Sequence, residues 1–67
     1  MVNYEIEGMT CNHCKMTVEK IFAENGKKAT ADLDYEIVSV NETLKEEELE
    51  KLRNRLSEDG YTLGNVK

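Results

Sequence analysis

The residues of this 67-residue chain whose types suit metal or redox chemistry lie close together, between Gly8 and Cys14. This stretch contains both cysteines and the only histidine, in the order Cys11-Asn12-His13-Cys14. Thiolates are soft anionic donors, and a spacing of two residues lets both sulfurs face one point across the first turn of a helix. The stretch therefore predicts a metal site formed by Cys11 and Cys14. Cu(I) is the first candidate, and Zn(II) or another thiophilic ion is the alternative.

Four further residues could belong to the site without being obligatory ligands. His13 lies between the cysteines, but adjacent helical residues point about 100° apart, so we expect its imidazole to face solvent; ligation in a dimer or to Zn(II) is the alternative. Met9 carries a thioether, yet we expect its apolar body to pack beneath the loop rather than bind metal. The Tyr61 hydroxyl is expected to cover or polarise the thiolates, an ordinary core tyrosine being the alternative. Thr10 directly precedes Cys11.

Other interpretations of the cysteine pair stay open at this point. A thiol–disulfide catalyst is one, although enzymes of the thioredoxin-like class are larger and usually carry an aromatic residue before the first cysteine. An incidental inert pair is another, but Cys-x-x-Cys beside glycine at a strand-to-helix junction is seldom accidental. A disulfide staple explains little, because so short a loop hardly constrains the unfolded chain. A structural zinc finger needs four ligands, and this chain supplies at most three.

Hydrophobic periodicity indicates the elements around this stretch. Alternating apolar and polar residues over 2–7 predict a strand that ends at Gly8. An apolar stripe at helical spacing follows the loop: Val18, Ile21 and Phe22. It predicts a helix from about His13 to Glu24, with Asn12 as its N-cap and Asn25-Gly26 as its stop. The second cysteine then lies in the first turn, where unpaired amides and the helix dipole favour a thiolate.

The second half of the chain continues with two strands, a helix and a strand. Residues 28–40 show no helical period and predict a hairpin that turns near Leu33 to Glu36. Thr43-Leu44-Lys45-Glu46 has the form of a capping box, and the leucines that follow predict a helix from about Leu44 to Asp59. A glycine then ends this helix, and a short last strand covers Tyr61 to Leu63.

This element order predicts an α+β fold of the ferredoxin-like βαββαβ type. Its four strands would form one antiparallel sheet with both helices on one face. Hydrophobic residues make up 39% of the chain, which is enough for a modest core, so we expect one domain over residues 1–67.

Charge excludes some classes of partner. Nine Lys and Arg face 14 Asp and Glu, and a net charge of -5 without a basic stripe disfavours nucleic acid. No apolar run approaches the roughly 20 residues of a membrane span, and no leader precedes Val2, so we expect a cytoplasmic protein without membrane insertion. Lys15, Lys20 and an exposed Met16 should lie near the site. The second helix carries four glutamates, so we expect an asymmetric electrostatic field around the molecule: Glu46, Glu47, Glu48 and Glu50.

The motif Gly8-Met9-x-Cys11-x-x-Cys14 resembles that of heavy-metal-associated domains, most closely the free-standing bacterial copper chaperones of that family. The resemblance covers the whole chain. Bacterial members are similar in carrying a histidine before the second cysteine, like His13, and a Gly-Tyr pair near the metal loop, like Gly60-Tyr61. The chain departs from the family in the second strand region, where Lys27 replaces a usual valine and Ala29 and Ala31 replace bulkier residues. The hairpin also lacks a turn glycine.

The resemblance implies a function. Cu(I) would be held by the sulfurs of Cys11 and Cys14 and passed by ligand exchange to a similar domain on a copper-transporting P-type ATPase, or to a copper-responsive regulator. No substrate would be chemically changed, so the chain would not be an enzyme. The protein would be a monomer, with a metal-bridged dimer as the alternative. Mercury, zinc and cadmium binders of the family share Met-x-Cys-x-x-Cys, so binding or detoxification of Zn(II), Cd(II) or Hg(II) is the alternative function.

Overall fold

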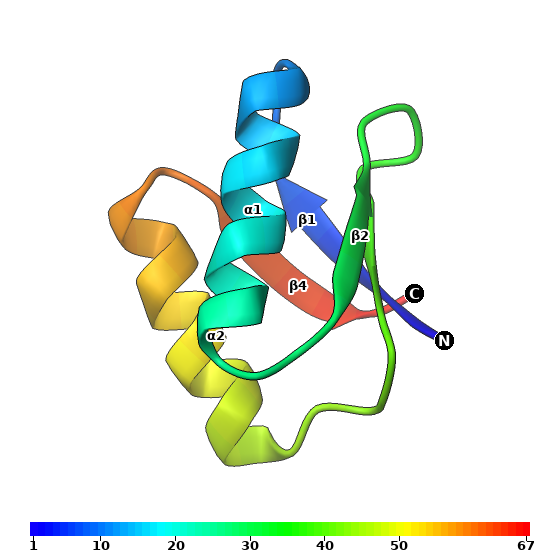
Figure 1. Ribbon diagram of the computed structural model, residues 1–67, viewed down its shortest axis with the longest axis vertical. Helices are drawn as coiled ribbons and strands as arrows, with labels where there is room; N and C mark the ends of the chain where they lie inside the picture. The colour runs from blue at the N-terminus through cyan, green and yellow to red at the C-terminus, as the bar shows by residue number, and fades with distance from the viewer.

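Six elements follow one another in the computed structural model, which describes residues Met1–Lys67. Their bounds are β1 Val2–Glu7, α1 Asn12–Glu24, β2 Ala29–Asp32, β3 Ile37–Val40, α2 Glu46–Glu58 and β4 Thr62–Val66. The four strands form one antiparallel sheet in the order β2-β3-β1-β4. Both helices cover the same face of the sheet (Figure 1). The predicted ferredoxin-like βαββαβ fold is confirmed. Neither helix has the length and apolar character needed to cross a membrane.

The core lies between the sheet and the two helices. Its 14 buried residues include the predicted stripe of α1, which is confirmed. The side chains with no measurable exposure are Ile6, Val18, Phe22, Val38, Val40 and Leu56. Ala31 is buried as well and Ala29 packs against the core, so the two small residues of β2 fit close beneath α1. Full burial of a large aliphatic or aromatic side chain stabilises the fold by about 1.5–3 kcal/mol.

The N-terminus of α1 differs from the prediction. Cys11, not Asn12, is the N-cap residue, with an extended backbone at φ -158° and ψ 174°. Its carbonyl accepts the first helical hydrogen bond, from the Lys15 amide at 3.2 Å. Asn12 is the first helical residue and its side chain caps nothing. The prediction that Asn12 is the N-cap is wrong. The N-cap is the last residue with an extended backbone before the helix, and the residue preference at this position does not determine which residue that is. The predicted stop is confirmed, since Asn25 is the C-cap and Gly26 has a φ of 77°.

The N-terminus of α2 also differs, because the helix begins at Glu46 and the N-cap is Lys45 rather than Thr43. The Glu48 carboxylate accepts a hydrogen bond from the Lys45 backbone amide at 3.1 Å, which is one half of a capping box. A lysine ammonium has no acceptor to complete the other half. Leu44 lies before the helix, and its amide donates to the buried Tyr4 hydroxyl at 2.8 Å. Burial of Leu44 at this contact fixes where the helix starts.

The β2–β3 hairpin turns over Leu33 to Glu36, as predicted. The Asp32 carboxylate accepts hydrogen bonds from the amides of Asp34 at 2.9 Å and Tyr35 at 3.2 Å. Glu36 takes the left-handed conformation, with a φ of 52°, in a place where glycine would carry no steric cost. The turn therefore closes through one carboxylate and one strained residue.

The last strand is longer than predicted. It covers Thr62–Val66, and Tyr61 lies just before it. The pairing of β4 with β1 shifts register between Tyr4 and Ile6. The strand continues beyond this shift, so that Val66 pairs with Tyr4. Alternation does not predict this extension because an irregular register breaks the period of two.

Lys27 has a local partner in this chain. Its ammonium pairs with the carboxylates of Glu42 and of Glu48, the latter at 2.7 Å, and its side chain is only 10% exposed. These hydrogen bonds raise the pKa of Lys27 and lower that of Glu48. The cluster joins the segment after α1 to the start of α2, at the opposite end of α1 from the cysteines.

Candidate metal site

The two cysteines lie at the start of α1 with their sulfur atoms facing each other. Cys11 is exposed, Cys14 is half-buried in the first helical turn, and their Sγ atoms are 3.8 Å apart. Neither is in a disulfide. Two thiolates on opposite sides of one ion would lie about 4.6 Å apart, twice a metal–sulfur bond of about 2.3 Å. The sulfurs thus need to separate by less than about 1 Å for linear binding, which a rotation of the exposed Cys11 side chain can supply.

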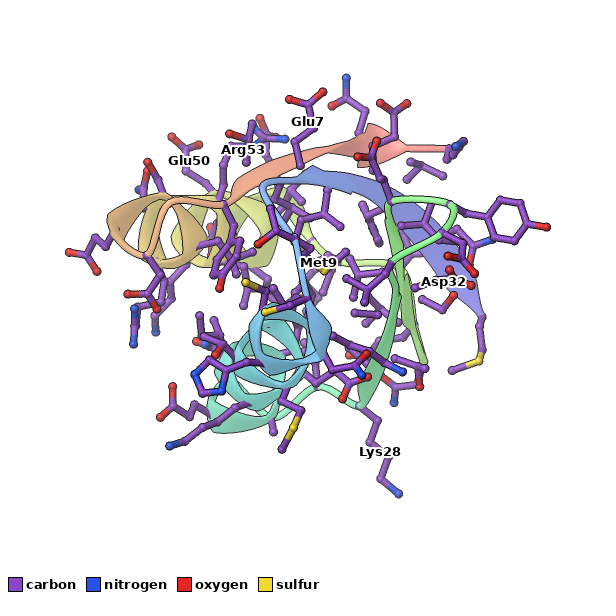
Figure 2. The ribbon with its side chains drawn as sticks, turned by 90° about the horizontal axis from the view of Figure 1, so that it is seen from above. Glu7, Met9, Lys28, Asp32, Glu50 and Arg53 are labelled. Carbon is purple, nitrogen blue, oxygen red and sulfur yellow. The ribbon has the colours of Figure 1, made fainter.

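The loop that carries Cys11 is held against the segment after α2. Gly8 has a φ of 102°, and a Cβ atom built there would lie 2.6 Å from the Gly60 carbonyl oxygen. Only glycine fits this approach. Met9 is 8% exposed and belongs to the core, and its side chain lies between the sheet and the helices (Figure 2). The structure therefore places Met9 where we expected it, as an anchor beneath the loop.

Donors from two segments surround the Cys14 sulfur. The backbone amide of Thr10 makes the largest contribution, followed by the Tyr61 hydroxyl and the Thr10 hydroxyl, whose oxygen lies 3.7 Å from the sulfur. These hydrogen bonds to the thiolate lower the pKa of Cys14 from its usual 9.0 to about 6. We expected the free helix amides to do this, but the residue before Cys11 supplies the main donor. Cys14 is therefore held mainly as a thiolate near neutral pH.

Tyr61 reaches the site from the far end of the sequence. Its side chain is 7% exposed, and hydrogen bonding from its hydroxyl is the second-largest cause of the lowered pKa of Cys14. The bond and burial together raise the pKa of Tyr61, so it stays a neutral donor. The Thr17 hydroxyl, which donates to the His13 carbonyl at 3.0 Å, is also within hydrogen-bonding reach of the Tyr61 hydroxyl. Sequence reasoning missed Thr17, although its spacing of three from Cys14 places both on one helix face.

His13 and Met16 lie outside the sulfur pair. The His13 side chain is exposed and lines an open groove of about 440 Å³ with Met16 and Lys20. Met16 is 66% exposed, as expected from its position outside the buried stripe. No three His, Cys, Asp or Glu side chains come together as a metal-binding group. The geometry therefore offers two sulfur donors, from the exposed Cys11 at the N-cap and the half-buried Cys14 in the first turn of α1.

Both cysteines lie in a part of the chain that is similar to a known protein family. The sequence model of a family described as heavy-metal-associated domain matches residues 3–62, a range that includes both cysteines and Tyr61. No curated protein and no solved structure gives a significant match.

Proposed function

Because the chain belongs to the heavy-metal-associated domain family and such domains bind heavy metals, we propose that it is a Cu(I) chaperone. Cys11 and Cys14 hold one ion between their thiolates, and the ion passes to a partner by ligand exchange. One observation carries this proposal: two facing sulfurs 3.8 Å apart without a third ligand gathered beside them. Soft thiolates in low coordination number suit Cu(I), whereas Zn(II) prefers four ligands.

The unequal surroundings of the two cysteines support an order of transfer. Cys11 is exposed and can rotate away, while Cys14 is half-buried and its sulfur accepts hydrogen bonds from Thr10 and Tyr61. An incoming thiolate of the partner takes the place of Cys11 first. Cys14 releases the ion last, when a second partner thiolate has bound. No bond of a substrate is made or broken other than metal–sulfur bonds, so the protein acts as a carrier and not as an enzyme.

The partner in this proposal is the metal-binding domain of a copper-transporting P-type ATPase, or a copper-responsive regulator, in the cytoplasm. It docks on the loop and on the face around Lys15 and Met16. Support comes from the exposed Met16 beside the loop and from the charge asymmetry between the start of α1 and the glutamates of α2. The protein acts as a single domain and as a monomer, and a metal-bridged dimer would arise only through the shared ion.

The test is anaerobic competition against a Cu(I) chelator. The wild-type protein is expected to bind one ion per chain, and Cys11→Ser and Cys14→Ser each to lose most of the affinity. His13→Ala is the matched control from the same loop, and it should keep the stoichiometry. Wild-type affinity in either serine variant would overturn the proposal. Preference for Zn(II) that depends on His13 would favour the zinc alternative, and insulin reduction at a thioredoxin-like rate would favour the redox alternative.

A further inference from the structure

Each edge strand of the sheet receives a charged side chain from a helix. On β2, the Glu19 carboxylate accepts a hydrogen bond from the Ala31 amide at 2.9 Å. On β4, the Arg53 guanidinium donates from Nε to the Leu63 carbonyl at 2.9 Å, and Figure 2 shows Arg53 beside this strand. Glu19 is the eighth residue of α1 and Arg53 the eighth of α2. In each half of the fold, the eighth residue of the helix thus forms a hydrogen bond with the backbone of the edge strand that follows that helix.

Both contacts reach peptide groups that face away from the sheet. The Asn41 amide donates to the Lys28 carbonyl at 3.0 Å, so the backbone groups of residues 28, 30 and 32 face β3 and those of Ala29 and Ala31 face outward. The Ile6 amide donates to the Glu36 carbonyl at 3.0 Å, on the β3 side of β1. Its partner on β4, Leu63, therefore directs its backbone groups outward. A carboxylate meets a donor at one edge, and a guanidinium meets an acceptor at the other.

The two edges differ in regularity. The pairing of β4 with β1 shifts register between Tyr4 and Ile6, and such irregularity discourages further strand pairing. The strand β2 pairs with β3 in unbroken register, from Ala29 with Val40 to Asp32 with Ile37. The straight edge that another strand could extend is therefore β2.

We propose that the outer edge of β2 is a self-association surface for a second copy of this chain, and that Glu19 holds it closed in the monomer. The strand is complementary to itself. In an antiparallel pair centred on Thr30, Ala29 lies opposite Ala31 of the second copy, and the outward groups of both alanines become paired. Lys28 then lies opposite Asp32 of the second copy, so opposite charges meet at both ends. Lys28 lies just before β2, and Asp32 is its last residue (Figure 2).

Glu19 opposes this pairing in two ways. Its carboxylate occupies the Ala31 amide, which is one of the two outward donors of β2. It also places a negative charge where the carbonyl oxygens of an incoming strand would lie, and in a symmetric pair the two Glu19 carboxylates would approach the same seam. Removal of this side chain exposes the donor and removes the charge. The inference is independent of the proposed copper function, because no cysteine takes part.

The test measures the mass of the metal-free, reduced protein by sedimentation over about a hundredfold range of concentration, since association follows mass action. Glu19→Met removes the acceptor at similar size, and its mass is expected to rise with concentration from 7.7 kDa toward twice that value. Glu19→Gln keeps an oxygen acceptor and should associate less than Glu19→Met. Glu24→Met, at an exposed glutamate in the last turn of α1, is the matched control and should stay monomeric.

A second change identifies the surface. Ala29→Pro removes an outward donor without removing a hydrogen bond of the sheet, so in the Glu19→Met background it should restore the monomer. A Glu19→Met protein that stays monomeric over the whole range overturns the proposal, as does a dimer that Ala29→Pro leaves intact. Circular dichroism checks the fold of each variant. Glu19→Ser, whose side chain is too short to reach Ala31, repeats the test should Glu19→Met not fold.

Discussion

The Tyr61 hydroxyl is one of the groups that lower the pKa of Cys14, and it so links the segment before β4 to the first turn of α1. Tyr61→Phe removes this donor, and the pKa of Cys14 should rise from about 6 because its thiolate loses one of its stabilising bonds. The measurement is the pH dependence of thiolate absorbance in metal-free protein. Tyr35→Phe, at an exposed tyrosine in the β2–β3 turn, is the control. An unchanged titration in Tyr61→Phe would show that the contact does not stabilise the thiolate.

The lowered pKa of Cys14 predicts how the stability of the metal-free, reduced protein depends on pH. In the unfolded chain the thiol titrates near 9.0, and in the folded protein near 6. Between these values the unfolded state binds more protons than the folded state. The contribution of the Cys14 thiolate to the free energy of unfolding is therefore fully present above about pH 9 and is lost as pH falls to about 6. Urea unfolding at a series of pH values measures this slope. Cys14→Ser should reduce it, and an equal slope in the two proteins would contradict the prediction.

Local patterns predicted the elements of the fold, while the contacts that define the site depend on topology. The helical spacing of the apolar residues places Val18 and Phe22 in the core, and this prediction does not require knowing which residues they pack against. The helix starts were less predictable, because Leu44 is held out of α2 by a bond to Tyr4 on β1. The close approach of Gly8 to Gly60 and the hydrogen bond of the Glu19 carboxylate to Ala31 leave no periodic signal. Such contacts follow from where the folded chain brings two segments together.

The close approach of Gly8 to Gly60 predicts a large effect of a small substitution. Gly8→Ala should destabilise the protein, because a Cβ atom there would lie 2.6 Å from a backbone oxygen and the φ of 102° disfavours any side chain. Gly26→Ala is the matched control, since its φ is 77° but no atom lies within 4 Å of the added carbon. It should cost only the backbone term of about 1–2 kcal/mol. Urea unfolding measures both, and a cost for Gly8→Ala no larger than that of Gly26→Ala would contradict the predicted clash.

Glu36 in the β2–β3 turn offers a stabilising substitution. Its φ of 52° is costly for a side chain and free for glycine, so Glu36→Gly should raise the free energy of unfolding. The expected gain is about 0.5–1 kcal/mol, after the greater flexibility of glycine in the unfolded chain is subtracted. Asp34→Gly is the control from the same turn, where φ is not positive, and it should give no gain. Equal effects at both positions would show that the turn is not strained at Glu36.

Charge asymmetry around the cysteines predicts how transfer of copper depends on salt. Lys15 lies in the first turn of α1 beside the loop and Lys20 further along the same helix, whereas the first turn of α2 carries Glu46, Glu47 and Glu48. Such a field orients an approaching partner domain more than it adds affinity. Exposed charge pairs contribute at most about 1 kcal/mol each, so the docked complex should be short-lived and the shared ion should supply much of its lifetime.

The measurement follows copper transfer to a candidate ATPase metal-binding domain as salt rises from about 0.05 to 0.5 M, a range over which the screening length falls severalfold. Transfer should slow with salt, and Lys15→Glu should slow it further at low salt because the charge beside the loop changes sign. Glu24→Lys, at an exposed residue in the last turn of α1, changes charge by the same amount in the opposite sense at the end of the helix away from the loop and is the control. Rates that stay flat with salt and are unchanged in Lys15→Glu would remove electrostatic docking and leave exchange through free solution as the better account.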